Sequence, residues 1–246
     1  MKTLGIIPAR YASTRFPGKP LVDILGKSMI QRVFEQVEKA KLMDKVIVAT
    51  DDQRIFAHVV AFGGTVQMTR ADHLSGTDRC AEIAENFAEF DLVVNIQGDE
   101  PFIDPSQIDQ LIQLLHDRQD FDVATLAKKI KEEAELFSPN IVKLLWTQAQ
   151  QAIYFSRHPI PFVRNAAQEA WLAQQDYYKH IGIYAFRRTQ LLTLAALAPS
   201  RLEQAESLEQ LRWLENGYRI GVGITELESM GIDTPEDLKK IIKKQA

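Results

Sequence analysis

The chain has 246 residues, of which 46% are hydrophobic and 25% charged, a composition typical of one globular α/β domain. Its formal net charge of -4 argues against a nucleic-acid partner held by diffuse positive charge. Any anion that binds here is therefore expected to be held by a local cluster of cations.

The apolar residues predict neither a membrane span nor a secretory leader. No apolar run reaches about 18 residues, and the first residues enter a strand pattern directly. We therefore expect a soluble, cytoplasmic protein. The single cysteine, Cys80, shares an apolar stripe with Ile83, Ala84 and Phe87. This position favours a buried core thiol over a nucleophile, and one cysteine leaves no disulfide or zinc cluster within the chain.

Strand and helix patterns alternate along the first half of the chain. Strands are predicted over 3–9, 45–50, 65–68 and 91–97, and helices over 28–42, 52–62 and 77–89. Continuous apolar runs are typical of strands covered on both faces, so we expect a parallel sheet wound with helices. Ligands bind such sheets beyond the carboxyl ends of the strands. This places three polar segments on one rim: 8–15 (PARYASTR), 50–52 (TDD) and 97–101 (QGDEP).

The second half of the chain changes character. Its pattern predicts a hairpin over 141–156, a strand over 179–186, a helix over 205–217, a strand over 219–225 and a last helix capped by Thr234. We interpret residues 1–246 as one mixed, mainly parallel α/β domain. Its section from about 130 to 185 is expected to be a β-rich insertion.

The loop after the first strand concentrates three cations, Arg10, Arg15 and Lys19. A P-loop would need Ser or Thr after the lysine, where this chain has Pro20, and no G-x-G-x-x-G follows the strand. A nucleoside triphosphate requires charge-assisted donors on several sides and small residues that let backbone N–H groups approach. The loop offers both. The alternative is a solvated loop whose cations pair with neighbouring carboxylates.

Seven segments, in this order, resemble the 3-deoxy-manno-octulosonate (Kdo) cytidylyltransferase family over residues 4 to about 240. They are 8–21 (PARYASTRFPGKPL), 68–79 (MTRADHLSGTDR), 95–101 (NIQGDEP), 154–157 (YFSR), 180–184 (HIGIY), 208–212 (LEQLR) and 231–238 (GIDTPEDL). The resemblance implies a nucleotide-diphospho-sugar transferase fold with a Rossmann-like sheet. It also implies transfer of CMP from CTP to Kdo with release of pyrophosphate, a Mg²⁺ cofactor, a homodimer and a place in lipopolysaccharide assembly.

The resemblance also implies roles for individual residues. The nucleotide would be bound by Pro8, Ala9, Arg10, Arg15, Lys19, Arg70, Asp72, Ser75, Gly76 and Gln97. The sugar acid would be bound by Gln97, Arg157, His180, Tyr184, Glu209 and Gln210. Asp99 and Asp233 would hold the metal and would act in catalysis together with Arg10 and Lys19. Cations placed in this way stabilise the charge that develops during attack on the α-phosphorus.

Simpler interpretations stand beside several of these roles. Without the resemblance, Asp99 is a turn residue, Asp233 belongs to a helix start, and Glu209 is solvated because it projects away from a leucine stripe. Glu100, next to Asp99, could take its place as a metal ligand. His73 is expected to be structural, since a lone histidine more often packs than catalyses.

Two other functions remain open from the sequence. One is a cytidylyltransferase for a related acidic sugar, such as 8-amino-Kdo or a nonulosonic acid. The other is a CTP-binding protein without catalysis.

For the dimer, we expect an exposed apolar patch within 160–178 that includes Phe162, Val163, Trp171 and Leu172. The alternative is that this segment packs against its own domain.

Overall fold

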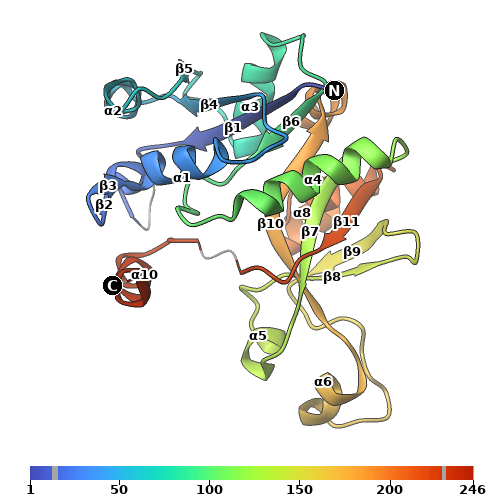
Figure 1. Cartoon of the computed structure of the whole chain (residues 1–246). Coiled ribbons are helices and arrows are strands. Elements are labelled where there is room, and N and C mark those ends of the chain that lie inside the picture. The colour runs from blue at the N-terminus through green and yellow to red at the C-terminus, as the bar shows by residue number, and fades with distance from the viewer. Residues whose placement is uncertain (13–15, 229–230, 246) are drawn as a thin grey trace.

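A mixed sheet organises the chain, for which the structure, a computed structural model, describes residues 1–12, 16–228 and 231–245 (Figure 1). Seven strands cross it in the order β11 (Ile220–Ile224), β7 (Val123–Lys129), β10 (Tyr178–Arg187), β6 (Leu92–Asn95), β1 (Thr3–Ala9), β4 (Lys45–Thr50) and β5 (Val66–Met68). β10 is antiparallel to both of its neighbours, β6 and β7, and the other pairs are parallel. The predicted mainly parallel sheet is confirmed.

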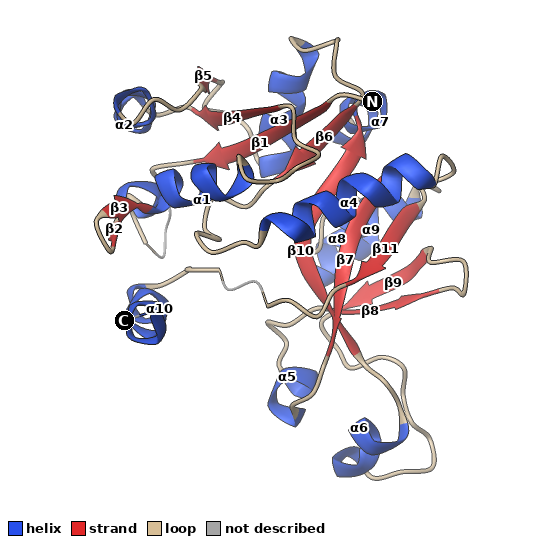
Figure 2. Ribbon diagram, viewed as in Figure 1, coloured by secondary structure: helices blue, strands red, loops and turns tan. Residues whose placement is uncertain are grey.

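Helices cover both faces of this sheet (Figure 2). One face carries α1 (Met29–Val37), α2 (Gln53–Ala61) and α4 (Pro105–Asp117), and the other carries α3 (Gly76–Glu85), α7 (Arg188–Ala195) and α9 (Gln210–Glu215). Successive residues of a strand point to opposite faces, so Ile7 packs in the core under α1 and Ile6 in the core under α3. Cys80 is fully buried in this second core, as predicted. Both faces of each central strand are therefore apolar, which explains the continuous apolar runs.

The predicted hairpin is present as β8 (Lys143–Trp146) and β9 (Ala152–Ser156), joined to β10 through β8. Most of β10 also falls within the section from 130 to 185, but the section is not made of strands alone. It carries α5 (Glu133–Phe137), the short helix η2 (Gln168–Ala170) and α6 (Trp171–Gln174), which form a lobe that projects beyond the sheet in Figures 1 and 2.

The lobe has a small core of its own, and this corrects the expected apolar patch. Trp171 is only 1% exposed, because it stacks on Tyr177 and contacts Phe137. Val163 and Leu172 pack against the same cluster. Phe162 alone among the four patch residues projects outward, with 69% of its surface exposed.

Three predicted helices differ from those observed, and several elements were not anticipated. The helix expected over 205–217 is divided into α8 (Arg201–Glu206) and α9, because Ser207 adopts a left-handed conformation with φ of 53°. The helix expected over 28–42 already ends at Val37, and the one expected over 77–89 ends at Glu85. α4 and β7 were not singled out from the sequence. No helix among the described residues is long and apolar enough to cross a membrane.

The chain end returns across the molecule to the loop that follows β1. After β11 it runs back beneath the sheet to α10 (Pro235–Gln245), as Figure 1 shows. Ile232 is fully buried against Ile24 and Met29, near η1 (Lys19–Leu21) and the small ribbon of β2 (Asp23–Ile24) and β3 (Lys27–Ser28). Thr234 caps α10 as predicted, since its Oγ1 accepts a hydrogen bond from the Asp237 N–H at 3.2 Å.

Candidate functional site

The site lies at the carboxyl ends of the parallel strands, where three polar segments were predicted from the sequence to lie together. Ala9 at the end of β1 pairs with Thr50 at the end of β4, and β6 runs alongside on the other side of β1. The backbone is closely packed here: a Cβ on Gly98 would lie 2.8 Å from the carbonyl oxygen of Pro8, and one on Gly76 would lie 3.2 Å from the Pro8 ring. A side chain at Gly98 would therefore meet the Pro8 backbone, and one at Gly76 would require the Pro8 ring to shift slightly.

Lys19 sits at the centre of an ionic cluster with the two predicted metal ligands. Its Nζ lies 2.7 Å from Asp99 Oδ2 and 3.2 Å from Asp233 Oδ1. Gly18, with φ of 71°, makes the tight turn that places Lys19 at the start of η1. Asp233 arrives from the returning chain end, which is tied to the loop after β6 by a hydrogen bond from Ile232 N–H to the Asp99 carbonyl at 2.9 Å. Asp99 lies in the turn after β6 and Asp233 lies just before α10, as the simpler interpretations expect, and both also contact Lys19.

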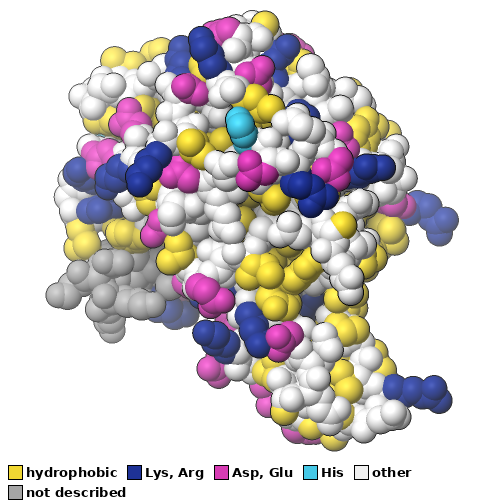
Figure 3. All heavy atoms as spheres, turned by 45° about the vertical axis from the view of Figure 1, so that its right-hand side comes forward, with side chains coloured by type: hydrophobic (Ala, Val, Ile, Leu, Met, Phe, Trp, Pro, Cys, Tyr) yellow, Lys and Arg dark blue, Asp and Glu magenta, His cyan; other side chains and the backbone are white. Residues whose placement is uncertain are grey.

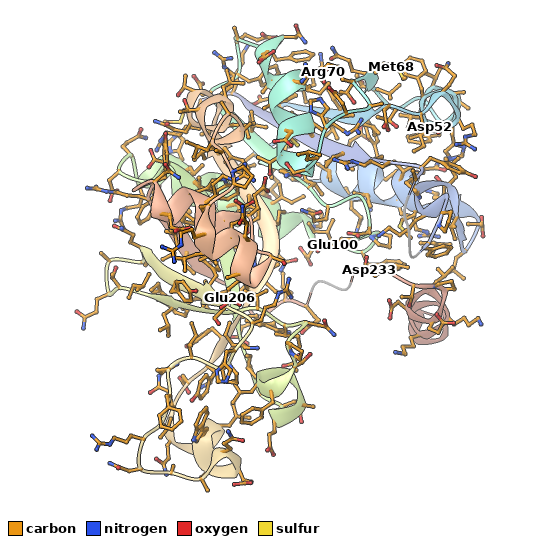
Figure 4. All side chains as sticks on the ribbon, turned by 180° about the vertical axis from the view of Figure 1, so that it is seen from behind. Asp52, Met68, Arg70, Glu100, Glu206 and Asp233 are labelled. Atoms are coloured by element: carbon orange, nitrogen blue, oxygen red, sulfur yellow. The ribbon has the colours of Figure 1, made fainter. Side chains whose placement is uncertain are left out.

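The two carboxylates of the cluster are of the ligand type that magnesium prefers. One ammonium group already shares the two carboxylates, so they are close enough to share another cation. Within the described part of the chain, no group of three or more His, Cys, Asp or Glu side chains could hold a metal. Magnesium needs fewer, because it binds through one or two carboxylates together with substrate phosphates and water. Figure 4 shows Glu100 beside Asp233, and Glu100 is 9% exposed.

Arg10, directly after β1, is a cation whose hydrogen-bonding capacity the protein does not use fully. Its Nη2 is buried and has no hydrogen-bond partner among the described residues. Burial and the neighbouring Arg79 lower the pKa of Arg10, and the carboxylates of Asp51 and Asp78 offset this effect only in part. A buried guanidinium nitrogen without a partner is costly in the free protein, and an anionic ligand would satisfy it. Arg15 lies outside the described residues.

The surface charge is consistent with binding by such a local cluster. Figure 3 shows one face of the molecule, on which cationic and acidic side chains alternate without forming a broad basic area. Sequence reasoning missed Arg79, which is fully buried on α3 and lies 3.3 Å from Asp51 across the rim. A charged residue in the first turn of a helix gives no signal that distinguishes burial from exposure.

The segment from 70 to 76 is held against α3 by two sets of hydrogen bonds. Ser75 caps the helix, with its Oγ accepting from the Asp78 N–H at 3.0 Å. Glu82 accepts the backbone N–H of Arg70 at 3.1 Å and also contacts His73 Nε2. His73 is buried in this pair, so the structural role predicted for it is confirmed. The side chains of Arg70 and Asp72 project outward, with 69% and 78% of their surface exposed.

Three of the predicted sugar ligands gather on the α3 side of the sheet. His180 and Tyr184 on β10 have ring centroids 5.3 Å apart. Glu209, at the start of α9, accepts a hydrogen bond from Thr77 Oγ1 at 2.7 Å, so the expectation from the residues alone that it is solvated is wrong. Burial lowers the pKa of His180 to about 3 and raises the pKa values of Glu209 and Tyr184. The imidazole is therefore neutral near pH 7.

Arg157 and Gln210 are two other predicted sugar ligands. Arg157 is fixed by hydrogen bonds to backbone carbonyl groups, and Gln210 is buried. The Arg157 guanidinium donates to the carbonyl oxygens of Glu206 at 2.6 Å, Pro139 at 3.0 Å and Ser207 at 3.2 Å, which fastens the end of β9 to the α8–α9 break. A sugar carboxylate would have to bind the N–H groups of Arg157 that these three hydrogen bonds leave unused. Gln210 is 4% exposed.

A groove of about 1020 Å³ lies next to the site, on the outer side of α3. Its lining includes Ser75, Asp78, Glu82, Glu209 and Arg212 but neither Lys19 nor Asp99. The groove therefore borders the residues predicted to bind nucleotide and sugar, and it lies apart from the ionic cluster.

Comparisons with known proteins agree with this geometry. A family model described as cytidylyltransferase matches residues 4–220. A 3-deoxy-manno-octulosonate cytidylyltransferase of Bacteroides thetaiotaomicron is 56% identical over 97% of this chain and 96% of the relative. The one from Parabacteroides distasonis is 54% identical over 98% and 97%.

Solved structures show the same similarity. A CMP:2-keto-3-deoxy-manno-octonic acid synthetase complexed with CTP superposes with a TM-score of 0.93 at 44% identity, covering 100% of this chain and 98% of the other. A 4-diphosphocytidyl-2C-methyl-D-erythritol synthase from Anaerococcus prevotii, 13% identical with a TM-score of 0.64 and 99% and 98% coverage, shares the fold.

Proposed function

We infer the reaction from one premise: the chain belongs to the 3-deoxy-manno-octulosonate cytidylyltransferase family. It is a cytidylyltransferase that joins CTP and Kdo to give CMP-Kdo and pyrophosphate, a step that supplies lipopolysaccharide assembly. The observation that carries this proposal is the pair of cations in the segment after β1, where a buried nitrogen of Arg10 has no partner among the described residues and Lys19 holds two carboxylates.

The residues of the chain act by positioning and by neutralising charge. The C2 hydroxyl of Kdo attacks the α-phosphorus in line and loses its proton to water. An O–P bond to the C2 oxygen forms, and the bond between the α-phosphorus and the bridging oxygen of pyrophosphate breaks. Negative charge develops on the α-phosphate oxygens and on the departing pyrophosphate, where Arg10 and Lys19 are placed to stabilise it. Because the protein already holds the Arg10 guanidinium in a desolvated position, little reorganisation accompanies the reaction.

Asp99 and Asp233 are the residues that would hold Mg²⁺. When bound, the ion supplies further neutralisation of phosphate charge and lowers the pKa of the attacking hydroxyl. Asp99 and Asp233 meet only in the folded chain, and Lys19 keeps them together in this structure.

The direct test of the function is pyrophosphate release from purified protein with magnesium and each of CTP, UTP and ATP, in the presence and absence of Kdo. Release that needs CTP and Kdo together supports the proposal. Release with 8-amino-Kdo or a nonulosonic acid, but not with Kdo, would instead identify the sister activity, and CTP binding without release would identify a non-catalytic protein.

Changing Asp99 to asparagine tests the metal assignment. The Asp99→Asn variant keeps the size of the side chain but removes a carboxylate charge, so we expect the magnesium-dependent kcat to fall about 100-fold or more. Steady-state kinetics over a magnesium titration measure the effect. Asp117→Asn, on the exposed end of α4, is the matched control and should leave both kcat and the magnesium optimum unchanged. Full magnesium-dependent turnover by a folded Asp99→Asn protein would refute the assignment.

Changing Glu82 to glutamine tests whether the segment from 70 to 76 binds nucleotide. The variant weakens the charge-assisted hydrogen bonds to the Arg70 N–H and to His73, so the segment loses its anchor on α3. We expect KM for CTP to rise about threefold to tenfold, the value of one hydrogen bond, with a smaller change in kcat. Glu85→Gln, three residues further along the same helix and exposed, should behave as wild type. Equal KM values for the two variants would contradict the role.

We also propose a cytoplasmic homodimer. The support is the lobe around α6, which projects from the sheet and exposes Phe162 over 69% of its surface. The aromatic ring packs edge-on against Trp171, with centroids 5.1 Å apart, so it is held in a defined orientation that a second chain could cover.

A further inference from the structure

β10 carries an irregularity where it passes the site. Along its pairing with β7, Ile181 lies opposite Leu126, but Tyr184 lies opposite the next residue, Thr125. Gly182 and Ile183 therefore have no counterpart on β7. Such bulges interrupt the ladder of hydrogen bonds and redirect the neighbouring side chains, which is why they recur beside active sites. Here the bulge separates His180 from Tyr184, two of the predicted sugar ligands.

The carbonyl groups of the bulge are bound by side chains from the strands on either side. Thr125 Oγ1 lies 3.2 Å from the Ile181 oxygen and 2.9 Å from the Ile183 oxygen. Gln97, after β6, donates from Nε2 to the Gly182 oxygen at 3.2 Å. Thr125 is fully buried, and no role for it was predicted from the sequence. The bulge is therefore held on one side by a predicted site residue and on the other by this threonine.

The same hydroxyl also contacts the His180 ring, with Oγ1 2.9 Å from Nε2. Thr125 has one hydroxyl proton, and both nearby carbonyl oxygens can only accept it. When the proton points to a carbonyl oxygen, Oγ1 must accept from His180, so Nε2 carries the imidazole proton. If the hydroxyl donated to Nε2 instead, its lone pairs would face two carbonyl oxygens without a proton between them. The contacts therefore select the neutral tautomer with N–H at Nε2.

We propose that Thr125 is a positioning residue for the sugar acid, which fixes His180 with Nδ1 as a hydrogen-bond acceptor for a substrate hydroxyl. Among the described residues no hydrogen bond to Nδ1 competes for this role. A sugar acid offers several hydroxyl donors, and an imidazole that remains neutral keeps its acceptor throughout the working pH range. The proposal rests on the proposed sugar-binding role of His180.

The tautomer can be measured without substrate. In protein labelled with ¹⁵N-histidine, the ring nitrogen shifts distinguish a protonated from an unprotonated nitrogen, and a His180→Gln variant identifies the signals. We expect wild-type His180 to be protonated at Nε2. Thr125→Val, which keeps the shape of the side chain and removes the hydroxyl, should change this pattern, and Thr125→Ser should restore it. A wild-type ring protonated at Nδ1, or a Thr125→Val ring with unchanged shifts, overturns the proposal.

Kinetics then test the consequence for the sugar. For Thr125→Val we expect KM for Kdo to rise about threefold to tenfold, as for the loss of one hydrogen bond, while KM for CTP stays unchanged. Thr125→Ser should recover most of the loss. An equal rise in both KM values, or no rise in either, overturns the positioning role. If wild type proves inactive with Kdo, the proposed function fails, and the NMR comparison still decides whether Thr125 sets the tautomer.

Discussion

The Arg10→Met variant is expected to lose at least about 100-fold in kcat/KM for CTP while its thermal stability stays the same or rises. The loss follows from removing a preorganised donor to the phosphates. The gain in stability follows because the charged form of Arg10 is disfavoured in the folded protein, where burial and Arg79 lower its pKa and Nη2 has no partner among the described residues. Methionine fills similar space without a charge to desolvate.

Steady-state kinetics and thermal unfolding followed by circular dichroism measure both effects. Relief of one unsatisfied buried group is worth about 1 kcal/mol. For a chain of this length, that corresponds to about 2 to 4 °C in Tm. Arg10→Lys, which retains a charge, is the matched control and should show no such gain. A fall of several degrees in the Tm of Arg10→Met would mean that Arg10 stabilises the fold.

The Lys19→Met variant is expected to lose about 100-fold or more in kcat, because the ammonium group no longer stabilises the transition-state charge. It should also bind magnesium more tightly in the absence of nucleotide. Asp99 and Asp233 share the Lys19 ammonium at 2.7 and 3.2 Å, and the Lys19→Met change removes the positive charge that both carboxylates contact. Their repulsion is relieved by a divalent ion.

Thermal unfolding with and without magnesium separates this effect from catalysis. We expect magnesium to raise the Tm of Lys19→Met more than that of wild type, because an ion that binds only the folded state stabilises it. Lys27→Met is the control, since Lys27 is exposed and pairs with Glu35 at 2.6 Å away from the two aspartates. A Lys19→Met protein with wild-type turnover, or with no added response to magnesium, would contradict the proposed arrangement.

The order of the elements could be read largely from the sequence, because hydrophobic periodicity reports which faces are buried. Their ends could not. A left-handed residue at Ser207 divides one expected helix in two, and the capping box between Ser200 and Glu203 starts the first of them. Both depend on local backbone conformation and single hydrogen bonds, which a pattern of apolar residues does not record. Trp171 was misplaced for a related reason: its periodicity indicates an apolar face but not which chain covers it.

For the site too, some features could be predicted from the sequence and others depend on the tertiary structure. The sequence by itself determined a parallel sheet with charged residues beyond the ends of its strands, since Arg10, Asp51 and Asp99 each come soon after a buried run. Only the tertiary structure decided which of them meet. Lys19 and Asp99 are 80 positions apart and Lys19 and Asp233 are 214 apart, and they come together because the returning chain end packs Ile232 into the core beside η1. The hydrogen bonds of Thr125 to the β10 bulge, and the burial of an Arg10 nitrogen without a partner among the described residues, likewise depend on how distant segments pack in the whole fold.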